Sequence, residues 1–166
     1  MNEKPQYPLM LTLRDAVSGN GFLAGVTLYG RALMVFEDGK WWMYGVRPGA
    51  IAESGTTPQE TFASFRERYK LALFDIAEEA SDFEDFKASV ESFYTQPDYF
   101  EENRWETAFK AIRSGNIIPE PPFFSTLPRV SPETRPTEIA VQRLDEQQRF
   151  SATDNVPDTY MLPLAA

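Results

Sequence analysis

The stretch that decides the fold is Arg31-Ala-Leu-Met-Val-Phe-Glu37, Asp38-Gly39 and Lys40-Trp-Trp-Met-Tyr-Gly-Val46. Its two apolar segments are rich in aromatic and β-branched residues, which favour strands. The Asp-Gly pair between them tolerates the positive φ angles of a two-residue hairpin turn. We therefore predict an antiparallel pair of strands joined at this turn.

Both faces of this predicted hairpin are apolar. Side chains alternate along a strand, so Trp42 and Tyr44 point to one face while Trp41 and Met43 point to the other. A sheet with one face in water would not show this pattern. If the helices cover one face, the other must be covered by a second chain or by the C-terminal region. We therefore predict Leu33, Trp41 and Met43 as interface residues of a homodimer or higher homo-oligomer.

A long helix is predicted after a Pro-Gly turn and a short strand at residues 50–53. Thr57 is its expected N-cap, Pro58 occupies the first helical position, and Glu60 completes a capping box. Apolar residues then recur at three- and four-residue spacing, which indicates a face packed on the sheet. This apolar stripe comprises Phe62, Phe65, Tyr69, Ala72, Leu73 and Ile76, and the polar residues expected opposite it are Arg66, Glu67, Lys70 and Glu78.

The remaining elements complete an α+β fold. Two strands are predicted before the hairpin, at residues 9–14 and 22–29, and Gly30 is expected to turn the second into the third. Two helices are predicted after the long one, at residues 81–95 and 99–115. The fold class is thus an antiparallel meander sheet packed by a long helix plus two added helices.

The C-terminal region is rich in proline, which predicts extended or polyproline-like backbone. We divide the chain into a single domain at 1–122, with a helical insertion at 81–115, and a Pro-rich C-terminal tail at 123–166. Within the tail, residues 137–149 could form a short helix. Residues 160–164 are apolar enough to dock on this chain or on a sister subunit, and the alternative is that they stay disordered.

Composition excludes several classes of function. The chain has no Cys and no His, which removes disulfides, thiolate metal sites, the commonest general base and the commonest metal ligand. A net charge of −9 opposes attraction to phosphate backbones and anionic lipid, so we expect no direct nucleic-acid or membrane partner. With no apolar run long enough for a bilayer and no export segment after Met1, we expect a cytoplasmic protein.

Acidic residues are concentrated between Glu78 and Glu106. One interpretation is a solvated helical face that aids solubility. The other is an acidic surface matched to a basic partner.

No catalytic constellation is present. A nucleophilic triad cannot form without His or Cys. The glycines at 19 and 21 lack the lysine and the spacing of a phosphate-binding loop. Four carboxylates are the remaining candidates for a divalent ion, although a hairpin turn and solvent exposure explain most of them. They are Asp15, Asp38, Asp75 and Glu79. We predict a non-enzymatic protein with no catalytic residue, no cofactor and no metal.

Four short motifs occur in the order found in a known family. They cover about residues 31–80 and 117–122, and they are Val46-Arg-Pro-Gly49, Glu53-Ser-Gly-Thr-Thr-Pro-Gln-Glu60, Phe65-Arg66 and Ile118-Pro-Glu-Pro121. This order resembles the HicB-like family, the antitoxin half of the HicA/HicB toxin–antitoxin pairs. Two extra strands before the motifs and two inserted helices depart from the family pattern.

The resemblance implies a partial ribonuclease-H-like domain without catalytic activity. A HicB-type antitoxin neutralises a small basic ribonuclease toxin by covering it, and negative charge agrees with that role. The alternative is a small-molecule or regulatory binding domain, with a pocket between sheet and helices lined by Trp105, Phe109 and Phe93. A carboxylate-metal enzyme ranks third.

Overall fold

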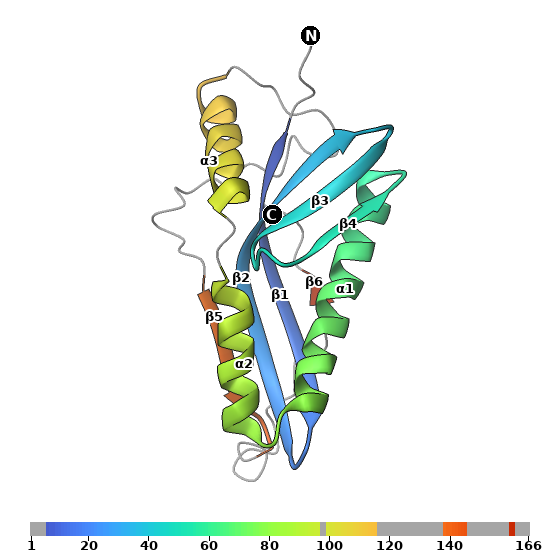
Figure 1. The fold of residues 1–166 in the computed structure, drawn as a ribbon. Coiled ribbons are helices and arrows are strands. Elements are labelled where there is room, and N and C mark those ends of the chain that lie inside the picture. The colour runs from blue at the N-terminus through green and yellow to red at the C-terminus, as the bar shows by residue number, and fades with distance from the viewer. Residues whose placement is uncertain (1–5, 97–98, 116–137, 146–159, 162–166) are drawn as a thin grey trace.

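The computed structural model describes residues 6–96, 99–115, 138–145 and 160–161, which form a curled antiparallel sheet with three helices (Figure 1). The predicted α+β class is confirmed at this level. In chain order the elements are β1 (Tyr7–Gly19), β2 (Phe22–Glu37), β3 (Lys40–Arg47), β4 (Ala52–Gly55), α1 (Pro58–Glu79), α2 (Phe83–Thr95), α3 (Tyr99–Arg113), β5 (Glu138–Arg143) and β6 (Tyr160–Met161).

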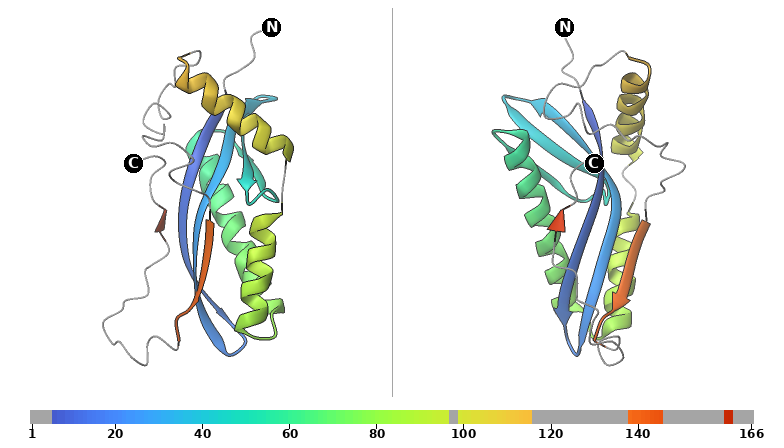
Figure 2. Two further views of the ribbon diagram at one scale, coloured as in Figure 1. Left: turned by 90° about the vertical axis from the view of Figure 1, so that its left-hand side faces the viewer. Right: turned by 180° about the vertical axis from the view of Figure 1, so that it is seen from behind.

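The long strand β2 is the centre of the sheet. Every residue of β1 pairs with a residue of β2, from Gly19 opposite Phe22 to Tyr7 opposite Met34. The other edge of β2 is shared, because its first half pairs with β5 and its second half pairs with β3. The remaining strands extend this arrangement to the order β4-β3-β2-β1-β6. Figure 2 shows β5 alongside β2 in both views.

The prediction of a turn at Gly30 is wrong, because β2 runs without interruption from Phe22 to Glu37. A bulge falls next to this glycine, where the register with β3 shifts between Arg31 and Ala32. A Cβ atom on Gly30 would lie 2.3 Å from the carbonyl oxygen of Arg47. Glycine is required there for close approach of two strands, and its presence says nothing about a turn.

The hairpin predicted at Asp38-Gly39 is confirmed. Both residues have positive φ, 52° and 77°, and Glu37 pairs with Lys40 across the turn. Both central residues of a type I′ turn have this sign of φ, which matches the twist of the flanking strands.

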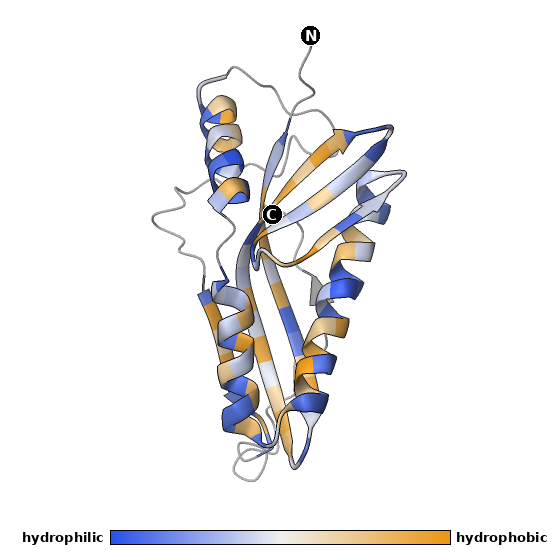
Figure 3. Cartoon of the chain, in the orientation of Figure 1, coloured by the Kyte–Doolittle hydropathy of each residue, from blue (hydrophilic) through white to orange (hydrophobic). Residues whose placement is uncertain are grey.

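One face of the sheet packs against α1 and α2. The buried residues of this α1 core include Leu9, Leu11, Leu13, Leu28, Met34, Met43, Phe65, Tyr69, Leu73 and Phe86. Figure 3 shows apolar residues recurring along the long strands that these helices cover. Burial of so much apolar surface is the main source of the stability of the fold.

Helix α3 packs against the opposite face, so the expectation that one face of the hairpin lacks a covering helix is wrong. The buried residues of this α3 core are Leu33, Val35, Val46, Trp105 and Ala108. The alternation predicted for β3 is confirmed, because Trp41 and Met43 contact the α1 core while Trp42 and Tyr44 contact the α3 core. The chain itself therefore covers both faces of the β2–β3 hairpin.

The helix termini follow the predicted signals with small shifts. The Thr57 hydroxyl caps α1 by accepting a hydrogen bond from the Glu60 amide at 3.1 Å. The Glu60 carboxylate accepts a hydrogen bond from the amide of Thr56 at 3.2 Å. Helix α2 is capped by Asp82 and begins at Phe83, two residues after the start of the predicted range 81–95.

Part of the predicted C-terminal tail belongs to the sheet. The prediction of a short helix within residues 137–149 is wrong for the described residues, because Glu138–Arg143 forms strand β5. Strand β6 shows Tyr160–Met161 docked on β1 of the same chain. The proline-rich residues 116–137 and most of the remaining tail lie outside the described residues.

Candidate functional site

The three predicted interface residues do not share a surface. Leu33 lies in the α3 core and Met43 in the α1 core, and each side chain has 0% of its surface exposed. Trp41 is partly buried, with its ring 5.3 Å from that of Phe36 and 6.3 Å from that of Tyr7. In this conformation neither Leu33 nor Met43 has surface with which to contact another chain.

The residues predicted to line a pocket are also separated. The rings of Trp105 and Phe109 stack with centres 5.3 Å apart and belong to the α3 core. Phe93 packs on the α1 core, across the sheet from them. The two stacked rings fill the space between α3 and the sheet.

A different hollow lies between α3 and the β3–β4 connection. Its volume is about 330 Å³, near the lower end of the range for small-molecule sites. Its lining consists mostly of small residues and backbone, namely Tyr44, Gly45, Gly49, Ala50, Ile51, Ala52 and Glu101.

An ionic cluster beside this hollow fixes α3 to the hairpin. The Arg104 guanidinium contacts Glu37 at 3.1 Å and Glu101 at 3.2 Å. The Tyr44 hydroxyl donates a hydrogen bond to the Glu37 carboxylate at 3.0 Å. The polar groups here are satisfied by one another, which indicates a role in attaching α3 rather than in catalysis.

Tyr44 should ionise only in strong alkali. Burial, together with its hydrogen bond to Glu37, raises its pKa to about 12, from about 10 for free tyrosine. Because the folded pKa is the higher one, this group contributes stability below pH ~10 that is lost as the pH rises through the folded value. Ultraviolet titration of tyrosinate, compared between the wild type and Tyr44→Phe, measures it. If the tyrosine that is missing from the Tyr44→Phe curve is one that titrates near pH 10 in the wild type, the expectation is contradicted.

A buried ion pair joins α1 to β1. The Arg66 Nη2 atom lies 2.6 Å from Asp15 Oδ1, and the Asp15 side chain is only 1% exposed. Asp15 Oδ2, Arg66 Nη1 and the Tyr69 hydroxyl are buried beside it without a hydrogen-bond partner among the described residues. Burial raises the pKa of the Tyr69 hydroxyl. The prediction that Arg66 faces solvent is wrong, and its pairing explains Asp15 without a metal.

The four carboxylates considered for a divalent ion serve different purposes. Asp15 pairs with Arg66, Asp38 occupies the hairpin turn, and Asp75 and Glu79 are exposed on α1. Within the part of the chain that the structure describes, no three acidic side chains are grouped to hold a metal ion.

The acidic stretch between Glu78 and Glu106 divides into paired and exposed residues. Glu101 contacts Arg104, and Glu102 lies 2.8 Å from Arg47. The exposed ones include Glu78, Glu79, Glu84, Glu91 and Glu106. Much of the acidic charge is therefore open to solvent along the helices.

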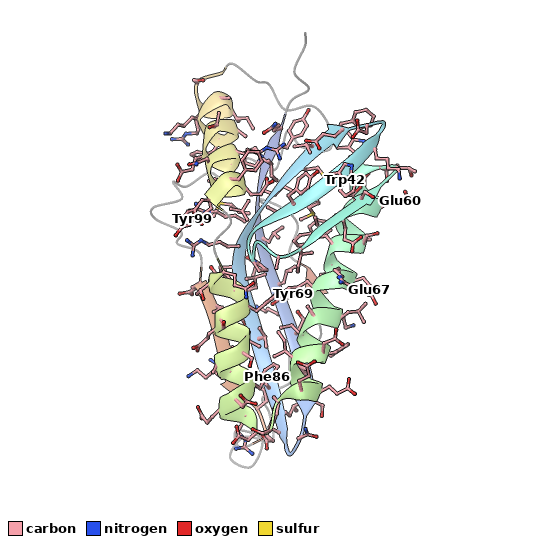
Figure 4. The ribbon with its side chains drawn as sticks, in the orientation of Figure 1. Trp42, Glu60, Glu67, Tyr69, Phe86 and Tyr99 are labelled. Carbon is pink, nitrogen blue, oxygen red and sulfur yellow. The ribbon has the colours of Figure 1, made fainter. Side chains whose placement is uncertain are left out.

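The side of α1 turned away from the sheet carries apolar residues that sequence analysis did not single out. Leu71 is 45% exposed and Phe74 is 40% exposed. Figure 4 shows Glu60 and Glu67 on this outward side and Tyr69 on the side facing the sheet. The signal was present in the sequence, because Leu71 and Phe74 fall outside the inner apolar stripe.

Comparison with known proteins gives no relative: no family model, curated protein or solved structure matches this chain. None of the helices in the described ranges has the length and apolar character needed to cross a bilayer. Function must therefore be argued from the chain itself.

Proposed function

We propose that this chain is a non-catalytic protein-interaction module that binds a small basic protein, as a HicB-type antitoxin does with its ribonuclease toxin. The observation that carries the proposal is the outward side of α1, where Leu71 and Phe74 are exposed on a helix whose exposed charged side chains are mostly acidic. Exposed apolar groups within a charged surround are typical of protein contact surfaces.

The order of elements supports the resemblance to the HicB-like family. The hairpin β2–β3, the Pro48-Gly49 segment, the short strand β4 and the capped helix α1 follow one another in the order that the motifs imply. Helices α2 and α3 lie within residues 81–115, the stretch that the resemblance treats as an insertion. The net charge of −9 suits a basic partner, because opposite charge speeds encounter and suppresses acidic competitors.

Co-expression tests this function. If a small basic open reading frame lies beside the gene, its product should arrest growth when expressed alone, and this chain should restore growth and co-purify with it. The complex should weaken at high salt, since charge complementarity is screened. A basic neighbour that is harmless alone and does not co-purify would count against the antitoxin role.

A small-molecule binding role is the second candidate. It is favoured by the hollow of about 330 Å³ beside Tyr44 and Glu101. A metabolite bound there should raise the melting temperature of the wild type. An Ala52→Trp variant, which fills the hollow from its exposed edge, should lose that shift.

A further inference from the structure

The outward side of α1 has the spacing of a helix-packing surface. Five residues at three- and four-residue intervals share this side, which we name the outer α1 surface, and they are Ala63, Glu67, Leu71, Phe74 and Glu78. Residues at this spacing lie one above the other on a helix. In a helix that packs on a sheet, the line farthest from the sheet is normally the most polar. Here it holds two large apolar side chains.

Charge on α1 selects the kind of partner. Its exposed charged side chains comprise one base, Arg68, and five acids, namely Glu60, Glu67, Asp75, Glu78 and Glu79. The half-buried Lys70 adds a second positive charge, with its ammonium 5.8 Å from the centre of the Phe74 ring, so acids still outnumber bases on the accessible part of the helix. A second copy of this chain would bring the same net charge of −9 and be repelled. A partner with basic residues around an apolar stripe is complementary in both respects.

A hollow beside the outer α1 surface offers a place for a basic side chain. Its volume is about 410 Å³, and its lining combines apolar with charged groups: Glu53, Ala63, Ser64, Glu67, Arg68 and Leu71. None of the ion pairs among the described residues uses Glu53 or Glu67. A lysine or arginine could lay its methylene groups on Ala63 and Leu71 and place its charge between the two carboxylates.

From these observations we infer that the outer α1 surface is the docking site for a basic amphipathic helix of another protein. The inference rests on the proposed function and adds the form of the partner and the residues that anchor it. Leu71 and Phe74 are the apolar anchors, and the hollow at Glu53 and Glu67 receives a cation. Extended by one turn to the exposed Glu60, this line of residues up to Glu78 is roughly 27 Å long at 1.5 Å per residue, which fits a partner helix of about 20 residues.

The test uses a fluorescent synthetic peptide of about 20 residues, with leucines at helical spacing flanked by lysines, and measures fluorescence anisotropy. The wild-type chain should bind it, and Leu71→Glu and Glu67→Lys should each weaken binding about tenfold or more. Phe100→Ser, which changes an apolar residue on α3 that is 69% exposed and so more open than Leu71, is the control away from α1 and should bind as the wild type does. A scrambled peptide of the same composition should bind more weakly.

Three outcomes would overturn the inference: unchanged binding by both α1 variants, equal binding of the scrambled peptide, or a Leu71→Glu variant whose own elution volume shows that it has lost a self-association. Substitutions at exposed positions such as these rarely alter stability much, so the variants should fold. If Leu71→Glu still restores growth against a basic toxin, the proposed function stands and only its placement on α1 fails.

Discussion

Replacing Arg66 with methionine should lower the free energy of unfolding by about 3–5 kcal/mol. The change leaves the Asp15 carboxylate buried with its nearest cation removed, since Arg66 Nη2 lies 2.6 Å from Asp15 Oδ1 in the wild type. A buried carboxylate without a partner is strongly destabilising, because no nearby positive charge offsets the cost of removing it from water. Urea unfolding followed by circular dichroism measures the shift of the midpoint.

Two further variants distinguish an ion-pair effect from general damage to α1. Arg68→Met makes the same chemical change two residues away at an exposed position, and should shift stability by no more than about 0.5 kcal/mol. Asp15→Leu combined with Arg66→Met removes both charges and should recover most of the loss. A double variant no more stable than Arg66→Met would show that the pair is not the cause.

The buried pair also shows where sequence analysis reaches its limit. The helical pattern placed Arg66 opposite the apolar stripe, because arginine is usually exposed. Its partner is on β1, 51 residues earlier, and a single sequence does not reveal which strand lies against a helix. The spacing of apolar residues identifies the buried face of a helix, but it does not show whether a charged residue at the edge of that face is also buried.

Turns and helix caps were predictable from the sequence where a residue type has one dominant structural role. The Asp38-Gly39 turn and the Thr57 cap depend on a few neighbouring atoms, and both are confirmed. Gly30 has two possible uses, a turn or a close approach of strands, and only the position of Arg47 decides between them. Strand β5 depends on its pairing with β2 and on the packing of Ile139 and Val141 against the α1 core, and both are contacts with residues far away in the sequence.

The two apolar faces of the hairpin were correctly predicted, but what covers them was not. The prediction was that the helices cover one face and that a second chain or the C-terminal region covers the other. Trp105 decides the matter, because it is 1% exposed and its indole N–H donates to the Leu9 carbonyl at 3.2 Å. The candidate contact surface accordingly moves from the sheet to the outer side of α1.

Trp105→Ala should have the second large effect, a loss of about 3–5 kcal/mol. The substitution removes the largest side chain of the α3 core, together with its hydrogen bond and its stacking on Phe109. The Arg31 guanidinium, 4.4 Å from the centre of the ring, also loses its contact. Trp105→Phe keeps most of the apolar area and should cost less, and Phe100→Ala on the exposed side of α3 should cost little.

Association should accompany this loss of stability. When α3 loosens, Leu33 and Val35 become exposed on one face of the hairpin, and an apolar face without its cover tends to bind another copy. Light scattering should therefore show the apparent mass of Trp105→Ala rising with concentration more steeply than that of the wild type. A variant with the wild-type midpoint in urea and the wild-type mass would mean that α3 does not protect this face, and the sheet would again be the first place to look for a partner.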